Sequence, residues 1–363
     1  MKLSLKMKIK PLRTNKMFML EKTLIDFKNA VNDWIDISWN DGKITDRKLH
    51  SYGYKELREK YPNLYSNSLQ DAMNWAIQIL RSSIKLNPNK KPIFNTLMVS
   101  YKSVDYKYEN EGLIIPLCGK RVFIPLYIPK KYKKYLQNGT FGRLVIKKEG
   151  NDYYAYLSIK VEEKEPYKPT LWFGVDLGVY NLVVVADSKG REILRFDGEI
   201  VKEYKKKLEK YRARIQSRQK RNFNKYTKVG NKISNYSKYI NHVISKEIVK
   251  KAKQYNAGIV LEKLKGLKKS KLNKSKPKNI RKALHIWSYA DLIKKIKYKA
   301  KLEGVPVVEI SPRNTSKTCS RCGYVNRRLK NERIFVCPKC GLEIDRDLNA
   351  SINIAKKVAS KQA

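Results

Sequence analysis

The sequence predicts an α/β domain in the C-terminal half of the chain, preceded by an antiparallel β-barrel domain that carries a helical insertion. Three observations support this fold class. Strand-like alternation of apolar and polar residues opens the chain and returns from Phe94 onward. A second series of strands begins near Thr170 and leads into long helical patterns. Two Cys-x-x-Cys pairs close to the C-terminus are typical of a small metal-binding module.

The N-terminal half is predicted to hold the barrel. Residues 2–10 alternate strictly between apolar and polar side chains, which predicts a half-buried strand. Three helical patterns follow, at about 14–38, 46–60 and 68–86. Alternation returns at 94–104, 112–118, 120–129 and 142–164, the last with a hairpin turn at 149–152. We expect the first strand to pair with the later ones, and residues 163–169 to form a linker.

The C-terminal half mixes short strands with long helices. Three strands with turns near Gly178 and at 187–190 predict a meander. Residues 202–253 carry two apolar stripes with a break around Gly230, which predicts a hairpin of two helices. The remaining expected elements are a strand ending at Glu262, a basic loop at 265–282, a helix at 286–303, a strand at 305–310, the cysteine module and a helix from about 348. This order is that of an RNase H-like α/β domain.

Charge is the strongest feature of the composition. The 363 residues include 80 Lys and Arg against 33 Asp and Glu, a formal net charge of +47. Such an excess predicts a polyanionic partner, most often nucleic acid. A membrane surface is the alternative, but no window approaches the roughly 18 apolar residues of a spanning helix. The first residues also lack the apolar core of a signal peptide, so we expect a cytoplasmic protein with reduced cysteines.

Four of the five cysteines form two pairs, Cys319 with Cys322 and Cys337 with Cys340. The gap of 14 residues between the pairs is one residue short of the usual zinc-ribbon range. Four thiolates suit one tetrahedral zinc ion, and a site closed by four protein ligands is structural, not catalytic. Four reduced cysteines without a metal are the alternative. The remaining Cys118 is interpreted as a core residue.

Acidic residues mark a second candidate site. Asp176 lies inside an apolar strand, Glu262 ends another, and Asp347 stands where the last helix begins. Burying a carboxylate is unfavourable unless it is paired or binds a cation. In an RNase H-like sheet these three positions converge, and two Mg²⁺ ions held there could cleave a phosphodiester. Taken singly, each acid has a structural alternative: a hydrogen-bonded Asp176, a solvated Glu262, or a helix N-cap at Asp345 or Asp347.

Several segments resemble the TnpB (OrfB) family of insertion sequences, relatives of the type V CRISPR effector nucleases. They are FGVDLG, IVLEKLKG, SPRNTSKTCSRCG, CPKCG and DRDLNASINI, and the likeness covers about 170–358. The resemblance implies that Asp176, Glu262 and Asp347 are the catalytic, Mg²⁺-binding residues of a RuvC nuclease site. It also implies that Asp345 is a secondary acid and that Asn349 and Asn353 orient the site. Lys263 departs mildly from the family pattern.

The resemblance further implies a domain plan. The expected boundaries are 1–12 and 89–169 for a wedge-like barrel, 13–88 for a helical recognition insertion, 170–310 and 345–358 for the RuvC-like nuclease, 311–344 for the zinc ribbon, and 359–363 for a tail. The ribbon would then be an insertion between the last strand and the last helix. The chain would return from it directly to Asp347.

What the resemblance implies about activity is an RNA-guided, Mg²⁺-dependent DNA endonuclease encoded by an insertion sequence. It would use a guide RNA to cut double-stranded DNA next to a short flanking motif, near the nucleoid of a prokaryotic host. A direct DNA transposase with the same three carboxylates is the first alternative. A guide-bound DNA-binding protein without cleavage is the second, and a ribbon-type RNA-binding protein the third. The sequence leaves open the guide, the flanking motif, the oligomeric state, and whether the locus is a transposon or a CRISPR system.

Overall fold

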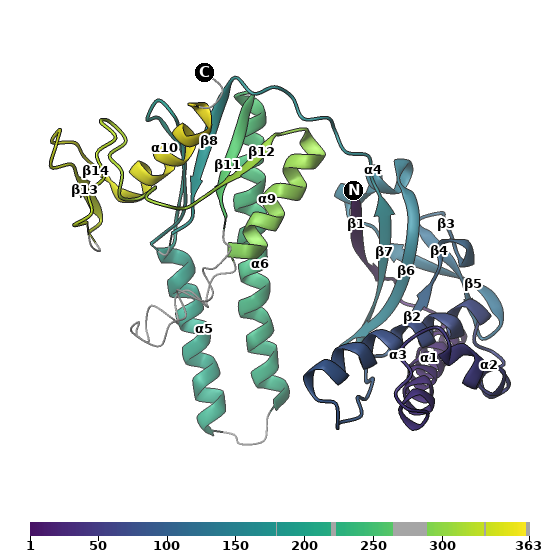
Figure 1. Cartoon of the computed structure of the whole chain (residues 1–363). Coiled ribbons are helices and arrows are strands. Elements are labelled where there is room, and N and C mark those ends of the chain that lie inside the picture. The colour runs from purple at the N-terminus through teal and green to yellow at the C-terminus, as the bar shows by residue number, and fades with distance from the viewer. Residues whose placement is uncertain (179, 219–222, 264–288, 330–331, 361–363) are drawn as a thin grey trace. The chain divides into compact units, whose positions relative to one another are not determined.

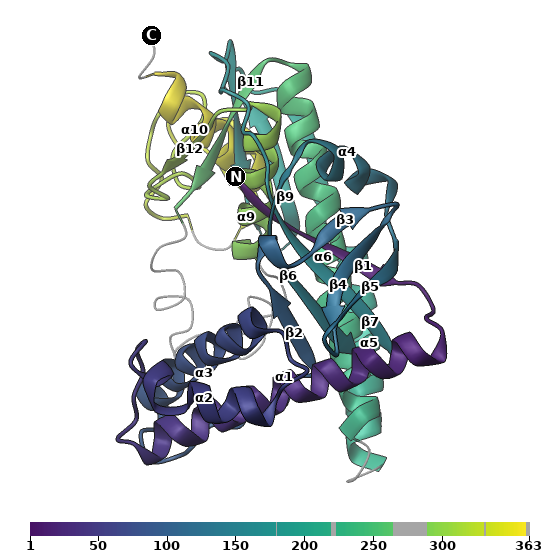
Figure 2. The same cartoon turned by 90° about the vertical axis from the view of Figure 1, so that its right-hand side faces the viewer.

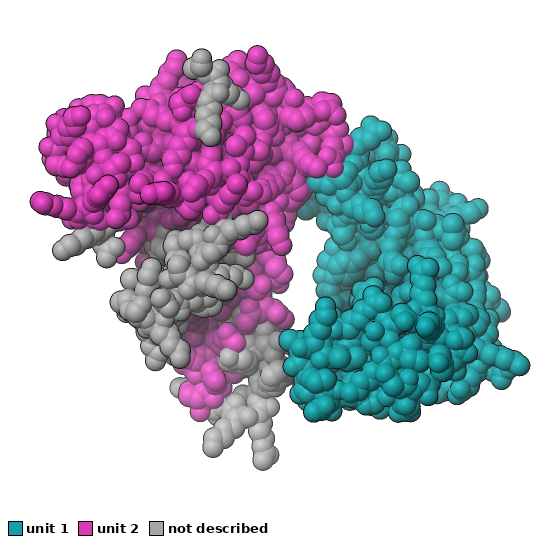
Figure 3. Space-filling model, viewed as in Figure 1, with its two compact units in different colours: residues 1–162 teal, residues 163–363 magenta. Residues whose placement is uncertain are grey.

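The computed structural model describes the chain except for residues 179, 219–222, 264–288, 330–331 and 361–363. The chain divides into two compact units, residues 1–162 and 163–363 (Figure 3). The boundary falls at the start of the predicted linker. Each unit is built around its own sheet and its own apolar core.

The first unit contains a seven-stranded sheet in which every neighbouring pair is antiparallel, in the order β2-β6-β7-β1-β5-β4-β3. Its strands are β1 Lys2–Ile9, β2 Met98–Tyr101, β3 Lys107–Glu109, β4 Gly112–Leu117, β5 Lys120–Tyr127, β6 Thr140–Glu149 and β7 Asp152–Lys160. The first strand pairs with β7 and β5, so it joins the later strands as predicted. β2 and β3 form the two edges, and closure into a barrel stays a prediction.

Three helices follow β1 in the chain and precede β2: α1 Thr14–Asn40, α2 Leu49–Lys60 and α3 Ser66–Leu86. They agree with the helical patterns of the sequence to within a few residues at each end. Figure 2 shows α1 as the long helix of this unit, with α2 and α3 beside it. Trp34 of α1 is fully buried, and its indole N–H donates to the carbonyl oxygen of Leu69 in α3 at 3.3 Å.

Three short elements of this unit were not predicted from the sequence: the 3₁₀ helix η1 Ser103–Asp105, the strand β3, and the helix α4 Lys130–Asn138. The buried residue of α4 is Leu136. Tyr132, Tyr135 and Leu136 share one face at helical spacing, but this nine-residue helix is shorter than the window of about 11 residues over which that period is recognised.

The second unit contains a mixed five-stranded sheet in the order β10-β9-β8-β11-β12. Its strands are β8 Leu171–Asp176, β9 Asn181–Asp187, β10 Glu192–Asp197, β11 Ala257–Glu262 and β12 Val307–Ile310. β8, β9 and β10 form the predicted antiparallel meander, whereas β11 lies parallel to both β8 and β12. This strand order and these directions are those expected of an RNase H-like sheet.

Helices cover the two faces of this sheet (Figure 1). They are α6 Phe223–Gln254, α9 Tyr289–Glu303 and α10 Arg346–Ala359, and α5 Glu199–Arg218 packs beside α6. The core on one face combines Phe173 and Ile259 of the strands with residues of α6 and α9. On the other face, Trp172 and Val260 pack against Ile354 of α10. A Cβ at Gly174 would lie 2.0 Å from the carbonyl oxygen of Ser351, so glycine permits α10 to approach β8 closely.

The predicted break around Gly230 is wrong. Gly230 lies inside α6, which begins at Phe223 and packs beside α5. A single glycine destabilises a helix by only about 1 kcal/mol, which tertiary packing readily outweighs. The basic loop predicted at 265–282 lies outside the described residues.

The cysteine module follows β12 and precedes α10. It contains a small antiparallel pair, β13 Ile334–Val336 and β14 Glu343–Asp345, in its own two-stranded sheet. Phe335 and Leu329 are buried beside Cys319 and Cys337, which gives the module a small core. Among the helices that the structure describes, none is long and apolar enough to span a membrane.

Candidate functional site

Two of the predicted acids end neighbouring parallel strands. Val175 of β8 lies opposite Leu261 of β11, so the next residues, Asp176 and Glu262, end their strands at the same level. Side chains alternate between the faces of a strand, and residues two apart share a face. Trp172 and Val260 face α10, and Asp176 and Glu262 stand at even intervals from them. Both acids therefore belong to the sheet face that α10 covers.

The third acid, Asp347, stands in the first turn of α10, with its side chain only 13% exposed. The side-chain amide of Asn181, the first residue of β9, donates to its Oδ2 at 2.8 Å. The same oxygen would lie 3.6 Å from a Cβ at Gly178, in the turn between β8 and β9. Asp347 is therefore held against the turn that immediately follows Asp176.

Tyr289, the first residue of α9, connects this turn to two of the acids. Its hydroxyl donates to the carbonyl oxygen of Gly178 at 2.8 Å. Burial, and after it the negative charges of Asp176 and Asp347, raise the pKa of Tyr289. Asp176 and Asp347 thus lie near the same phenol, although 170 residues separate them in the sequence.

Glu262 is held from another direction. The hydroxyl of Thr315, in the loop between β12 and the first cysteine, donates to its Oε1 at 2.6 Å. Three carboxylates offer the oxygen ligands that Mg²⁺ prefers, so the donor set fits divalent cations. In the described part of the chain, only the four cysteines bring at least three potential metal-ligand atoms within 4.8 Å of one another.

Asp345 has a structural role in α10. As the N-cap residue, it accepts hydrogen bonds from the backbone N–H groups of Asp347 and Leu348, both at 3.0 Å. Arg195 and Arg333 also lie beside its carboxylate, at 3.4 and 3.6 Å. The helix-cap alternative of the sequence analysis therefore describes Asp345, and these contacts occupy much of its carboxylate.

Asn349 and Asn353 are buried on the face of α10 that meets the loop before the cysteines. Asn349 accepts from the backbone N–H of Ser320 at 2.9 Å and donates to the carbonyl oxygen of Thr318 at 2.8 Å. Asn353 donates to the carbonyl oxygens of Thr315 and Thr318. These hydrogen bonds are made to the backbone of residues 315–320 and not to the three acids, so any orienting effect on the site is indirect.

Four residues near the acids were not singled out from the sequence: Asn181, Tyr289, Thr315 and Arg333. Arg333 lies in the cysteine module, 3.2 Å from Oδ2 of Asp347. Thr315 belongs to a segment that carries the family resemblance, but nothing in its local pattern indicates a contact with Glu262. Asn181 and Tyr289 each begin an element, where a polar residue has many ordinary roles. Sequence alone gave no means of choosing them.

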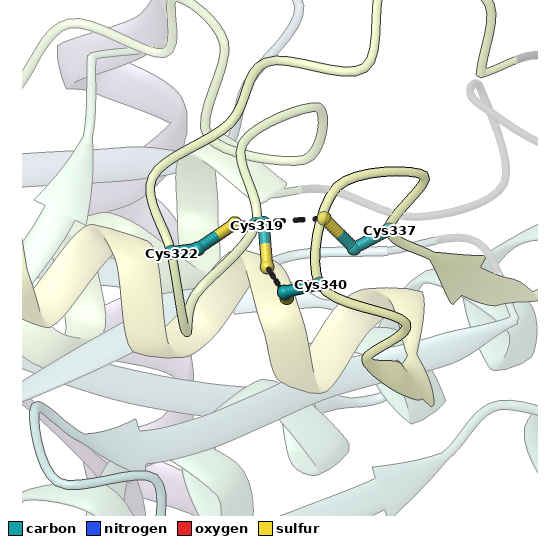
Figure 4. Close-up of side chains that lie close together, drawn as sticks. All are labelled: Cys319, Cys322, Cys337 and Cys340. Carbon is teal, nitrogen blue, oxygen red and sulfur yellow. Dashed lines mark hydrogen bonds between the residues drawn. The ribbon is translucent and has the colours of Figure 1, made fainter.

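The cysteine side chains point toward one another from the two knuckles (Figure 4). The Sγ atoms of Cys319 and Cys340 are 3.7 Å apart, and those of Cys322 and Cys337 are 3.6 Å apart. Zinc–sulfur bonds of about 2.3 Å in a tetrahedron place sulfurs roughly 3.8 Å apart, so the four thiols fit a structural metal such as zinc.

The two cysteines of the second knuckle differ in pKa, because a backbone hydrogen bond to Cys340 is outweighed by burial and by hydrogen bonds among the thiols, which raise its pKa, while that of Cys337 is lowered. Burial opposes ionisation of Cys337, but the backbone N–H groups of Cys340 and Lys339 donate to its sulfur and lower its pKa to about 6. Gly323 and Gly341 follow the two knuckles with φ of +75° and +68°. This left-handed conformation suits glycine, and it lets each glycine N–H donate to the carbonyl oxygen of the first cysteine in its pair.

Two family models match the chain. Residues 156–278 match the model described as "Probable transposase", named OrfB_IS605. Residues 289–354 match the model described as "Cas12f1-like, TNB domain". The first match covers the meander, the helical pair and Glu262, and the second covers the cysteine module and Asp347.

Curated relatives include both kinds of protein. A TnpB-like protein of Methanocaldococcus jannaschii is 29% identical over 269 residues, which is 69% of this chain and 92% of the relative. The CRISPR-associated endodeoxyribonuclease Cas12f1 of Syntrophomonas palmitatica is 29% identical over 218 residues, 56% of this chain and 42% of the relative. These matches confirm the resemblance to the TnpB family and to the effector nucleases related to it.

Among solved structures, the Cas12f1–sgRNA–target DNA complex matches with a TM-score of 0.63 at 18% identity, over 94% of this chain and 82% of the other. The RNA-guided endonuclease Cas-phi3 matches with a TM-score of 0.51 at 12% identity, over 98% and 92%. At these identities the matches show a shared fold. That fold extends over both units of the chain.

Proposed function

Because this chain is a relative of the TnpB-like proteins and the Cas12f nucleases, we propose that it is an RNA-guided, Mg²⁺-dependent DNA endonuclease encoded by an insertion sequence. It would cut double-stranded DNA next to a short flanking motif, at the nucleoid of a prokaryotic cell. The observation that carries the proposal is that Asp176 and Glu262 end adjacent parallel strands, while Asp347 lies against the turn that follows Asp176.

The positions of the acids support a hydrolytic role. Asp176 and Glu262 end adjacent parallel strands, and Asp347 is held against the turn after Asp176 by Asn181. Rigid strands and a helix start keep carboxylates in place better than loops do. Without cations, three such acids repel one another. We assign Asp176, Glu262 and Asp347 as the residues that would hold two Mg²⁺ ions.

When bound, two cations at such a site activate a water molecule and stabilise the leaving oxygen of a phosphodiester. The protein's own residues would fix the geometry. Asn181 donates to Asp347 and Thr315 donates to Glu262, so each acid has one oxygen engaged and retains the other. Tyr289 braces the turn between Asp176 and Asn181. The Arg333 guanidinium, beside Asp347, lies where it could meet a substrate phosphate.

The cysteine module would bind one Zn²⁺ and would be structural. All four ligands come from the protein, which leaves no open position for a substrate. We accordingly assign residues 311–344 to a zinc ribbon, and 170–310 with 345–358 to the nuclease. The first unit would supply a wedge-like barrel at 1–12 and 89–169, with a recognition insertion at 13–88. Residues 359–363 would form a tail.

The proposed partners are a guide RNA and a double-stranded DNA target, the kinds of molecule that accompany Cas12f1 in its solved complex. The net charge of +47 suits a protein that holds a long nucleic acid by its phosphates. A guided nuclease delegates sequence recognition to base pairing and reads only a short flanking motif with its own side chains.

The proposal is tested with the guide-bound protein and Asp176→Asn, Glu262→Gln and Asp347→Asn. Each substitution is nearly isosteric and removes one anionic ligand. We expect each to reduce target cleavage by about a thousandfold, because the cations supply several kcal/mol of transition-state stabilisation, while DNA affinity changes less than about threefold because binding rests on the basic surface. Full cleavage by any two of the three variants would refute the assignment.

A direct transposase is the second candidate, favoured by the family model described as "Probable transposase". A transposase reads its DNA ends with its own side chains, so it should act without RNA. The test treats the purified protein with ribonuclease, confirms that it stays folded, and assays cleavage with and without a reprogrammed guide. Cleavage that survives RNA removal at the same sequence would favour the transposase. Cleavage that follows the new guide supports the guided nuclease.

A further inference from the structure

We propose that Thr315 is a positioning residue for Glu262, and that α10 holds Thr315 in place through Asn353. The inference rests on the proposed function and deepens it. The hydroxyl of Thr315 lies 2.6 Å from Oε1 of Glu262, and Thr315 is only 5% exposed. The carbonyl oxygen of Pro312 is a second acceptor at 3.2 Å. The bond to the carboxylate is shorter, as expected for a donor facing a negative charge.

The direction of this hydrogen bond matters for cation binding. A carboxylate accepts only, so the hydroxyl proton must point at Oε1, which leaves Oε2 for a cation. Glutamate has three side-chain torsions, and a hydrogen bond to one carboxylate oxygen restricts them. A buried donor that fixes one oxygen imposes this restriction before any cation arrives. Residues behind metal ligands commonly act in this way.

The Thr315 backbone is itself anchored to α10. Asn353 Nδ2 donates to the carbonyl oxygens of Thr315 at 2.9 Å and Thr318 at 2.6 Å. Lys357, one turn further along the helix, donates to the carbonyl oxygen of Arg313 at 2.7 Å. The helix that presents Asp347 in its first turn therefore also fixes the loop that fixes Glu262.

Through these contacts, α10 positions two of the three acids. Asp347 is part of α10, and Glu262 is tied to it through Thr315 and Asn353. The buried Asn353 is thus interpreted as an anchor of the Thr315 loop. Its effect on the site passes through Thr315 and not through a direct contact with a carboxylate.

The test measures binding of Mn²⁺, a paramagnetic substitute for Mg²⁺, to the full-length, guide-bound protein by electron paramagnetic resonance, without any cleavage step. Thr315→Val keeps the shape and removes the donor, and we expect it to weaken Mn²⁺ binding about tenfold, the lower end of the effect for residues behind metal ligands. Thr315→Ser keeps the donor and should stay within about twofold of the wild type. Thr318→Val is the matched control, because the Thr318 hydroxyl donates to the carbonyl oxygen of Asn314 and not to Glu262.

Mn²⁺ binding by Thr315→Val equal to that of the wild type overturns the inference. So does a Thr315→Ser variant as weak as Thr315→Val, since the methyl group and not the hydroxyl would then matter. Thr315→Ala provides a second donor-free variant if Thr315→Val fails to fold. If the wild type and Glu262→Gln bind Mn²⁺ equally, the proposed function fails first. If Glu262→Gln loses Mn²⁺ while Thr315→Val keeps it, only the role of Thr315 fails.

Discussion

The guanidinium of Arg333 lies 3.2 Å from the Asp347 carboxylate, although one residue belongs to the cysteine module and the other to the last helix. The same guanidinium is 3.6 Å from Asp345 and stacks over the ring of Tyr180 at 4.7 Å. Arg333 therefore neutralises part of the negative charge of Asp345 and Asp347. A cation that binds Asp347 must share this carboxylate with Arg333 or displace it.

Arg333→Gln should therefore tighten divalent cation binding. The Arg333 side chain is 42% exposed, and pairs exposed to this degree contribute up to about 1 kcal/mol, so the gain in Mn²⁺ affinity should not exceed roughly fivefold. Mn²⁺ titration followed by electron paramagnetic resonance measures it. Arg195→Gln is the control, because Arg195 pairs with Asp345 and Glu192. Weaker Mn²⁺ binding by Arg333→Gln would mean that the arginine supports the cation site.

Zinc should be present at about one ion per chain, and Cys337→Ser should lose it. A structural zinc ion contributes on the order of 10 kcal/mol in small modules, whereas the core beside these cysteines is small. Elemental analysis gives the metal content, and limited proteolysis should show new cleavage between Cys319 and Cys340. Cys118→Ser is the matched control and should keep its zinc. Folded wild-type protein without zinc would contradict the prediction.

Asp345→Ala should lower stability by about 1 kcal/mol, because it removes the N-cap of α10. Cleavage of target DNA by Asp345→Ala should fall much less than cleavage by Asp347→Asn. Asp345→Asn keeps a capping oxygen and should restore most of the stability in thermal unfolding. If Asp345→Asn instead proves as inactive as Asp347→Asn, the charge at 345 acts as a cation ligand, and the cap is not its main role.

Lys205 of α5 gives a pH prediction. It is 1% exposed, and burial lowers its pKa to about 8, with Glu209 opposing the shift. Between about pH 8 and pH 10.5, the ordinary lysine pKa, Lys205 binds more protons in the unfolded chain than in the folded protein. The free energy of unfolding should therefore rise with pH in this range. Below about pH 8, Lys205 is charged in the folded protein, and burial of this charge lowers the stability by its full amount. Lys205→Met should therefore stabilise the protein at pH 7, by at most about 3 kcal/mol, and the gain should vanish above the ordinary lysine pKa.

Thermal unfolding of Lys205→Met and the wild type at neutral and high pH measures this difference. Lys206→Met removes an exposed neighbouring lysine and controls for the general loss of charge. An effect of Lys205→Met that is the same at both pH values would show that the ionisation of Lys205 has no part in it.

Binding of nucleic acid should depend steeply on salt. For a duplex, the slope of log K against log salt is about −0.9 for each phosphate neutralised. A chain with a net charge of +47 should neutralise on the order of ten phosphates, which gives a slope near −9. Titrations of target-duplex binding across a range of salt concentrations measure it. A slope of only about −1 or −2 would mean that most of this charge is unrelated to nucleic acid.

The sequence by itself determined the local features of this protein. Alternation in residues 2–10 predicted β1, and apolar runs predicted the strands that end at Asp176 and Glu262, because side-chain periodicity depends only on the element itself. The two Cys-x-x-Cys pairs predicted the thiol cluster for the same reason, since short spacing places both ligands of a knuckle together.

Only the tertiary structure decided which distant residues meet. The register that places Val175 opposite Leu261 aligns two acids, and the packing of α10 on β8 at Gly174 brings a third toward them. The packing of α10 also makes Asp345 a helix N-cap, and the tertiary structure places Thr315 beside Glu262 and Arg333 beside Asp347. Such contacts depend on how whole helices and strands pack. The residues adjacent to each partner in the sequence do not indicate which distant residue it will contact.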